Sequence, residues 1–286
     1  WESTYGLMEK YGDLLTGFEF AFDQGIPDHF IKGMPFFTPD NHASLENVRS
    51  KVKDSIAKEL LAGRMFGPFT QEEVHASDGA IRPINDLSYP RNNTNTKSVN
   101  SFVNKKDFNT TWDNFNTVSK FFTEEKRQVE LALFDWEKAY RQIPTKMRQW
   151  RYLMVKDFHG RFLLDTQITF GGVAGCGSFG RPADAWKEIM RSHFDLITIF
   201  RWVNNNLFVR SLGSTTDMKD VVAKSKELGV LTNEKKFSSF LVEQKFIGFV
   251  WNGIEKTVRL PDGKIEKRIS QLLLFLNKKE KFGYKQ

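Results

Sequence analysis

Residues 129–144 read VELALFDWEKAYRQIP and carry the strongest structural signal in the chain. Residues 130–135 predict a buried strand that ends in a carboxylate, Asp135. A short helical stretch over 137–141 follows and ends at Ile143-Pro144, because the residue before a proline is disfavoured in a helix. Asp135 either presents a functional charge at the strand end or caps the helix that follows. Both interpretations stay open from the residues alone.

Downstream, residues 200–208 read FRWVNNNLF and predict a β-hairpin. An apolar run stops at three asparagines and resumes at Leu207, and asparagine tolerates the backbone conformations of tight turns. A helix over 216–228 follows. Strands near 245–251 and 257–260 flank the turn dipeptide Asn252-Gly253, and a last helix begins near residue 262.

Between these segments, strands over 150–158 and 162–168 meet at His159-Gly160, and a glycine-rich turn over 171–177 opens a helix around 183–193. From residue 129 onward the order is therefore β-α-(β-β)-α-β-β-α-β-β-α. This order is compatible with an α+β fold whose central sheet is a split βαβ antiparallel sheet with helices on one face.

The first part of the chain is less regular. Apolar residues four positions apart predict a helix over 45–63, and Asp78-Gly79 predicts a tight turn between two short strands. Residues 1–45 are expected to combine short helices with irregular structure. The asparagine-rich stretch 90–116 is expected to be a long polar loop.

Composition excludes several protein classes. The chain has 286 residues, and its single cysteine, Cys176, excludes a disulfide scaffold and a cysteine-rich zinc site. It has no apolar run long enough for a membrane span, and residues 1–4 do not begin a signal peptide, so we expect an intracellular protein of the cytoplasm or nucleus with no membrane partner. The net charge of +7 suits a polyanionic partner or an ordinary solvated surface equally well.

Six short segments in one order resemble the fingers and palm of a retroelement reverse transcriptase, most of all those of the fungal DIRS-type (tyrosine-recombinase) retrotransposons. The segments are 81–88 (IRPINDLS), 133–144, 169–178 (TFGGVAGCGS), 200–208, 228–237 (LGVLTNEKKF) and 244–253 (QKFIGFVWNG). The resemblance implies a right-hand polymerase fold with the start of a thumb. The implied division is 1–128 N-terminal extension and fingers, 129–144 and 169–243 palm, 145–168 fingers insertion, and 244–286 primer-grip hairpin and start of thumb.

The resemblance also implies roles for residues around the incoming nucleotide. Asp135 matches a carboxylate that binds catalytic metal, and the backbone carbonyl of Trp136 lies beside it. Tyr140 matches the aromatic gate that crowds a ribose 2′-OH. Arg82 matches an arginine that pairs with the triphosphate, which suits the planar guanidinium group. Its alternative is an ordinary surface arginine.

Further positions follow from the other segments. Phe170 and Gly171 match a turn that packs against template and nucleotide, although a glycine-rich turn is also an ordinary helix entry. Lys235 and Lys236 match a lysine proposed to protonate the leaving pyrophosphate, or are solvated charge. Three residues match the primer grip or form a core hairpin: Phe246, Gly248 and Trp251.

One motif departs from the family. Where the family carries aromatic-x-Asp-Asp, this chain has Asn204 and Asn205. Nucleotidyl transfer to a primer 3′-OH uses two Mg²⁺ ions held by carboxylates, and an asparagine amide brings no charge. We therefore expect weakened Mg²⁺ binding at Asp135 and loss of most polymerase activity.

Three functions remain open from the sequence. The first is a reverse transcriptase domain that acts on a dNTP with a primed RNA or DNA template, impaired in this copy. The second is a non-catalytic module that binds RNA or an RNA–DNA duplex. The third is a structural or protein-interaction role.

Overall fold

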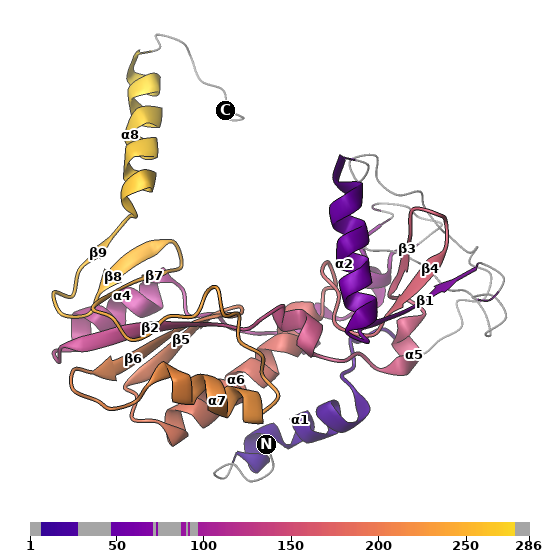
Figure 1. Ribbon diagram of the computed structural model, residues 1–286, viewed down its shortest axis with the longest axis horizontal. Coiled ribbons are helices and arrows are strands. Elements are labelled where there is room, and N and C mark those ends of the chain that lie inside the picture. The colour runs from indigo at the N-terminus through magenta and orange to yellow at the C-terminus, as the bar shows by residue number, and fades with distance from the viewer. Residues whose placement is uncertain are drawn as a thin grey trace. The chain divides into compact units, whose positions relative to one another are not determined.

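A computed structural model describes residues 7–27, 47–70, 73, 87–89, 91 and 97–277. The chain divides into two compact units, which we call the first and the second unit (Figure 1). Both units combine helices with antiparallel sheets, as the sequence predicted. The first unit comprises Trp1–Thr111, Trp136–Ser192 and Ser225–Leu231, and the second comprises Trp112–Asp135, His193–Lys224 and Thr232–Gln286.

The second unit is built on a three-stranded antiparallel sheet in the order β2-β6-β5. Its strands are β2 (Val129–Asp135), β5 (Thr198–Trp202) and β6 (Asn205–Ser211). The central strand β6 is buried on both faces, which explains its nearly continuous apolar run over 207–209. The register places Asp135 opposite Asn205, so the end of β2 lies beside the β5–β6 turn.

Helices cover both faces of this sheet, whereas the sequence predicted helices on one face. The helix α4 (Phe115–Glu124) packs on one face together with the β7–β8 hairpin, and α7 (Met218–Glu227) lies on the other (Figure 1). The hairpin strands β7 (Glu243–Phe246) and β8 (Phe249–Asn252) continue into β9 (Val258–Arg259), and α8 (Asp262–Asn277) follows.

The aromatic rings of α4 and β8 form the core of this layer. Phe122 and Trp251 have ring centroids 5.1 Å apart, and Trp251 is completely buried. Large rings contribute much of the apolar area that such a layer buries. Gly253 lets the hairpin approach β2, because a Cβ at this position would lie 2.1 Å from the backbone oxygen of Val129.

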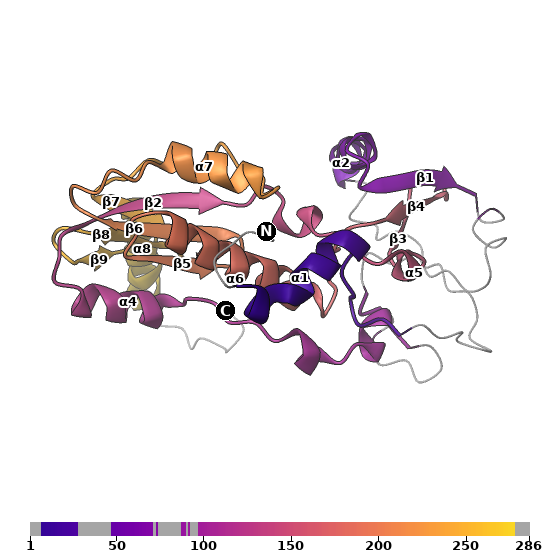
Figure 2. The same ribbon diagram turned by 90° about the horizontal axis from the view of Figure 1, so that it is seen from below.

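The first unit contains the sheet β1-β4-β3, with strands β1 (Met65–Phe69), β3 (Met154–Lys156) and β4 (Phe162–Asp165). The helix α2 (Arg49–Leu61) packs Ile56 and Leu60 against this sheet (Figures 1 and 2). The helix α1 (Met8–Phe20) packs Tyr11 and Leu14 against Ala185 of α6 (Gly175–His193).

Short helical turns complete the first unit: η2 (Val99–Phe102), η3 (Lys105–Phe108), η4 (Ala139–Gln142) and α5 (Met147–Trp150). Among the described residues, no helix is both long and apolar enough to span a membrane.

Several sequence predictions need correction in detail. The strand predicted near 245–251 is in fact two strands, because Ile247 and Gly248 adopt positive φ angles of 45° and 87° and turn the chain. The strand predicted from residue 150 begins later, since residues 147–150 form α5. The predicted helix over 45–63 is confirmed as α2. The predicted Asp78-Gly79 hairpin lies outside the described residues.

Candidate active site

Asp135 ends β2 in the second unit, and its side chain is 2% exposed. One carboxylate oxygen, Oδ2, accepts a hydrogen bond from Asn204 Nδ2 at 2.9 Å and lies 3.6 Å from Lys236 Nζ. The backbone oxygen of Asp135 accepts a hydrogen bond from the Asn233 backbone N–H at 2.8 Å. Three residues that the sequence predicted as a group, Asp135, Asn204 and Lys236, are thus in contact.

The β5–β6 turn explains how Asn204 reaches Asp135. The strands end at Trp202 and resume at Asn205, so Val203 and Asn204 form a two-residue turn. Val203 has φ 54°, a left-handed conformation that a β-branched residue rarely adopts. Strain of this kind persists only where surrounding contacts impose it, and it is frequent at functional sites.

Asn206, which the sequence did not single out as a site residue, holds this turn against β2. Its side chain is fully buried, and Nδ2 donates to the backbone oxygens of Phe134 at 3.3 Å and Asn204 at 3.0 Å. These bonds join β2 to the turn. Asn205 is exposed and, by the strand register, lies opposite Asp135.

The electrostatics of the cluster centre on one buried anion. Burial raises the pKa of the Asp135 carboxyl above its usual value, against the attraction of Lys236 and a hydrogen bond from Asn233, which both lower it. The negative oxygen also fixes the orientation of the Asn204 amide, because a reversed amide would bring its own oxygen against the carboxylate.

The side-chain groups gathered at Asp135 do not fit the coordination of a pair of magnesium ions. Mg²⁺ needs anionic oxygen ligands, and Asp135 is the one carboxylate in this cluster. Its Oδ2 faces an amide N–H and an ammonium group, both of which repel a cation. Within the described part of the chain, no group of three or more His, Cys, Asp or Glu residues is arranged to hold a metal ion.

In the first unit, the side chains of Tyr140 and Phe170, which the sequence analysis assigned separately to nucleotide binding, lie against each other. Their ring centroids are 5.4 Å apart, and Phe170 is 70% exposed. The Tyr140 hydroxyl lies 3.1 Å from Cys176 Sγ. Gly171 has φ 90°, a conformation that favours glycine. The result is an exposed aromatic surface at the entry to α6.

Asn100 holds the glycine-rich turn and was not singled out from the sequence. Its Nδ2 donates to the Gly171 backbone oxygen at 2.8 Å, and its Oδ1 accepts from the Val173 N–H at 2.9 Å. Asn114 likewise caps α4 by accepting from the Thr117 N–H at 3.1 Å. Asparagines within residues 90–116, the stretch predicted to be a polar loop, therefore have specific structural roles.

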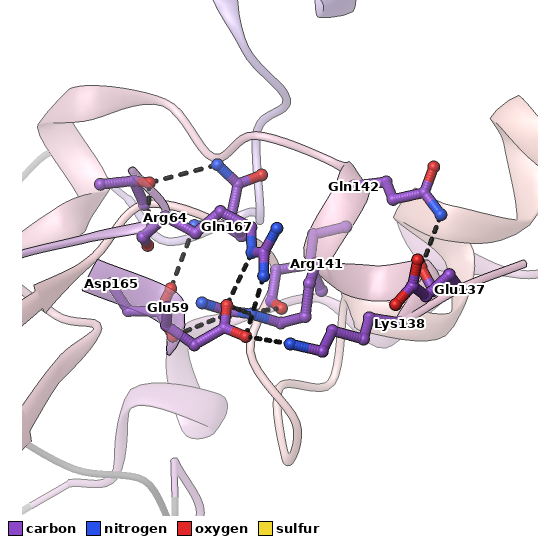
Figure 3. A network of polar contacts seen from close by, with 10 residues as sticks. Glu59, Arg64, Glu137, Lys138, Arg141, Gln142, Asp165 and Gln167 are labelled. Atoms are coloured by element: carbon purple, nitrogen blue, oxygen red, sulfur yellow. Dashed lines mark hydrogen bonds and ion pairs between the residues drawn. The ribbon is translucent and has the colours of Figure 1, made fainter. Parts of the chain in front are cut away.

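A second polar network surrounds Glu59 of α2, also in the first unit (Figure 3). Three cations converge on the Glu59 carboxylate: Arg64 at 2.7 Å, Lys138 at 2.8 Å and Arg141 at 3.1 Å. Arg141 also contacts Asp165 of β4 at 2.7 Å. The network thereby attaches residues 138–141, the segment that carries Tyr140, to α2 and β4. The three cations lower the pKa of Glu59 to about 2 against the opposing effect of burial.

Gln142 connects the same segment to the loop after α7. Its Oε1 accepts from the Leu231 N–H at 2.9 Å, and its Nε2 donates to the Leu231 oxygen at 3.1 Å and the Glu137 oxygen at 2.6 Å. Figure 3 shows the contact with Glu137. Lys235, farther along this loop, is exposed, and its backbone N–H donates to Asn233 Oδ1 at 3.2 Å.

Other predicted site residues contribute side chains to the core. Trp136 is 2% exposed and packs edge-on against Phe179 and Trp186, with ring centroids 5.3 and 5.5 Å away. In the β7–β8 hairpin, the side chains of Phe246 and Trp251 are buried, and the Trp251 indole donates to the Phe246 oxygen at 3.1 Å.

The functional assignments of these core residues remain predictions. For Trp136 the predicted contact is made by the backbone carbonyl. In the hairpin, Gly248 sits in the turn and the Lys245 side chain is exposed. Arg82 lies outside the described residues.

Comparison of the whole chain with solved structures identifies its fold. Foamy viral protease-reverse transcriptase in complex with double-stranded DNA matches with a TM-score of 0.55 and 13% identity, over 99% of this chain and 48% of that one. A second such structure matches with a TM-score of 0.54, 14% identity, and 96% and 59% coverage. The same protein with an RNA/DNA hybrid matches with a TM-score of 0.54, 13% identity, and 96% and 38% coverage.

The chain has a reverse-transcriptase-like fold. It spans about half the length of the foamy viral chains, between 38% and 59% in these three structures. No family model and no curated protein sequence matches it. The reverse-transcriptase-like part of the sequence prediction is therefore confirmed, and the assignment to DIRS-type elements remains a prediction.

Proposed function

We propose that this chain is the polymerase domain of a retroelement reverse transcriptase, with the predicted fingers, palm and start of thumb, and that its catalytic centre is impaired. In this proposal the β2-β6-β5 sheet is the palm sheet, and the retroelement is of the DIRS type. The observation that carries the proposal is the contact of Asp135 with Asn204 and Lys236 at the β5–β6 turn.

The remaining residues of the site keep their binding roles in this proposal. The half-buried Tyr140 ring and the exposed Phe170 ring form a pair that suits the sugar and base of an incoming dNTP. Lys235 and Arg82 contribute positive charge for its phosphates, and the β7–β8 hairpin contacts the primer. A primed RNA or DNA template completes the expected set of partners.

Impairment follows from the chemistry of nucleotidyl transfer. The attacking 3′-OH and the leaving pyrophosphate both develop negative charge, which two Mg²⁺ ions normally stabilise between carboxylates. One carboxylate with two neutral partners cannot hold two divalent ions, so the transition state lacks its main electrostatic support. Substrate binding, which depends on other groups, is expected to be retained.

Primer extension tests this proposal. The Asn204→Asp/Asn205→Asp double variant should extend a primer on an RNA template in Mg²⁺ several orders of magnitude faster than the natural sequence. Adding Asp135→Asn to the double variant should abolish the gain, because the metal site again loses a carboxylate. Extension by the natural sequence at a rate near that of the double variant would contradict the impairment.

A non-catalytic nucleic-acid-binding module is the second candidate. The foamy viral neighbours hold double-stranded DNA or an RNA/DNA hybrid, and this chain has a net charge of +7. Affinity for an RNA–DNA hybrid should fall steeply with salt, because phosphate contacts release counterions. A flat dependence on salt would argue against both nucleic-acid functions.

A further inference from the structure

We propose that Lys236, together with the Asn204 amide, takes the place of a divalent cation at Asp135, so that this end of the palm sheet is stabilised by an internal counter-ion. The inference deepens the proposed function and rests on its assignment of Asp135 to the catalytic position. It assigns Lys236 a role different from that of a proton donor to pyrophosphate.

Asp135 is buried at the end of β2. A carboxylate that is 2% exposed is costly to keep ionised unless it has a partner. Two of its partners converge on the same oxygen, Oδ2: the Asn204 amide at 2.9 Å and the Lys236 ammonium at 3.6 Å. That oxygen would otherwise be available to a metal ion.

The backbone that carries Lys236 is held in place by hydrogen bonds to Asn233. The Asn233 backbone N–H donates to the backbone oxygen of Asp135 at 2.8 Å, and the Asn233 backbone oxygen accepts from the Lys236 backbone N–H at 3.0 Å. Asn233 Oδ1 also accepts the Lys235 N–H at 3.2 Å. One residue thus joins the end of β2 to the turn that presents Lys236, although the lysine side chain itself is 60% exposed.

The formal charge of this cluster also disfavours a divalent cation. Asp135, Asn204, Asn205 and Lys236 together have zero formal charge, whereas aspartates at 204 and 205 would give the same four positions a charge of minus two. Four side chains with zero net charge do not attract Mg²⁺ electrostatically. The asparagines and the lysine therefore act together: the amides remove the excess negative charge, and the ammonium neutralises what is left.

Thermal unfolding with and without MgCl₂ tests the inference, with choline chloride at matched ionic strength as the salt control. The natural sequence should show no saturable rise in Tm with Mg²⁺. Lys236→Met, which keeps the aliphatic stem and removes the ammonium, should lower Tm by several degrees without metal, and Mg²⁺ should recover part of that loss. The adjacent Lys235→Met is the matched control and should leave Tm unchanged.

Two results would overturn the inference. One is a saturable rise in the Tm of the natural sequence with Mg²⁺ that disappears in Asp135→Asn. The other is a Lys236→Met variant with the same Tm as Lys235→Met.

Direct metal binding provides a readout that does not depend on the folding of Lys236→Met. Mn²⁺ titration followed by electron paramagnetic resonance should find no saturable site at Asp135 in the natural sequence, and a saturable site in Asn204→Asp/Asn205→Asp that is lost on adding Asp135→Asn. Saturable Mn²⁺ binding to the natural sequence that Asp135→Asn removes would also overturn the inference.

Hybrid binding in EDTA separates this inference from the proposed function. If the proposed function is wrong, the protein should show no affinity for an RNA–DNA hybrid, while the Tm and Mn²⁺ titration results stay as expected. Failure of the inference alone would appear as metal binding by the natural sequence with hybrid affinity intact.

Discussion

Replacing Glu59 with glutamine should destabilise the first unit strongly, although Glu59 has no predicted contact with a ligand. The change keeps the shape of the side chain and removes the negative charge on which Arg64, Lys138 and Arg141 converge (Figure 3). Glu59 is 7% exposed and Arg141 8%, so their charges are poorly solvated. After the substitution, Asp165 is the remaining carboxylate contact of Arg141.

The size of the effect follows from the pKa of Glu59. The folded protein lowers it from the ordinary 4.5 to about 2. At about 1.4 kcal/mol per pKa unit, this corresponds to roughly 3 kcal/mol, which we reduce to about 2–3 kcal/mol because Lys138 is solvent-exposed. Removing one partner of a buried ion pair costs about 3–5 kcal/mol, a similar range. The expected fall in Tm is roughly 5–10 °C.

The pH dependence identifies the cause. Because the pKa of Glu59 is lowered on folding, its contribution is complete above pH 4.5 and is lost as the pH falls from 4.5 towards about 2. Burial raises the pKa of Asp165, so its ionised form costs stability near neutral pH, and this cost disappears in acid. Comparing natural protein with Glu59→Gln at each pH gives the Glu59 contribution together with its coupling to Asp165, because the Glu59 charge helps to raise the pKa of Asp165.

The assay is thermal or urea unfolding at pH 7, 5.5, 4.5 and 3.5, followed by a signal from the first unit. Asp13→Asn is the matched control, because it neutralises a carboxylate in an exposed ion pair with Arg181 of the same unit, where the expected cost is below about 1 kcal/mol. A Tm for Glu59→Gln within about 2 °C of the natural protein at pH 7 would refute the reasoning. So would a difference that does not shrink below pH 4.5.

Two further predictions concern backbone contacts. Gly253→Ala should destabilise the second unit by about 1–3 kcal/mol in urea unfolding, because its Cβ would meet the Val129 backbone oxygen. The control Gly263→Ala, with open space around the added Cβ, should change stability by less than about 1 kcal/mol. Equal effects of the two substitutions would contradict the steric explanation. Asn100→Asp should cost about 1–3 kcal/mol and speed hydrogen exchange over residues 169–174, because aspartate cannot donate to the Gly171 oxygen; unchanged exchange would show that Asn100 does not hold this turn.

Much of the strand and helix order was predictable because it depends on local pattern. The buried run that forms β2, the hairpin β5–β6 and the helices α2 and α8 follow from apolar spacing and turn residues. The helix α4 was missed because the asparagine-rich stretch 90–116, which overlaps its start, was predicted to be a polar loop. Its apolar side chains do recur at helical spacing, and Asn114 is an N-cap signal in the sequence.

The candidate site was predictable only in part. The motif order identified Asp135, Asn204 and Lys236 as a group, and the structure places them in contact. Asn206 was missed because it lies within an asparagine run read as turn residues, whereas the strand register buries it beneath the turn. Glu59 was missed because two of its three partners, Lys138 and Arg141, lie 79 and 82 residues away along the chain, and no local pattern indicates such contacts.

The sequence by itself determined many of the elements, where Asp135 falls on its strand, and that two asparagines follow in the β5–β6 hairpin. Only the tertiary structure decided what those residues face. It directs Asn204 and Lys236 to the same oxygen of Asp135, and it buries Trp251 in the core. The physical reason is that local backbone preferences act over a few residues, whereas burial and ion pairing depend on segments brought together by packing.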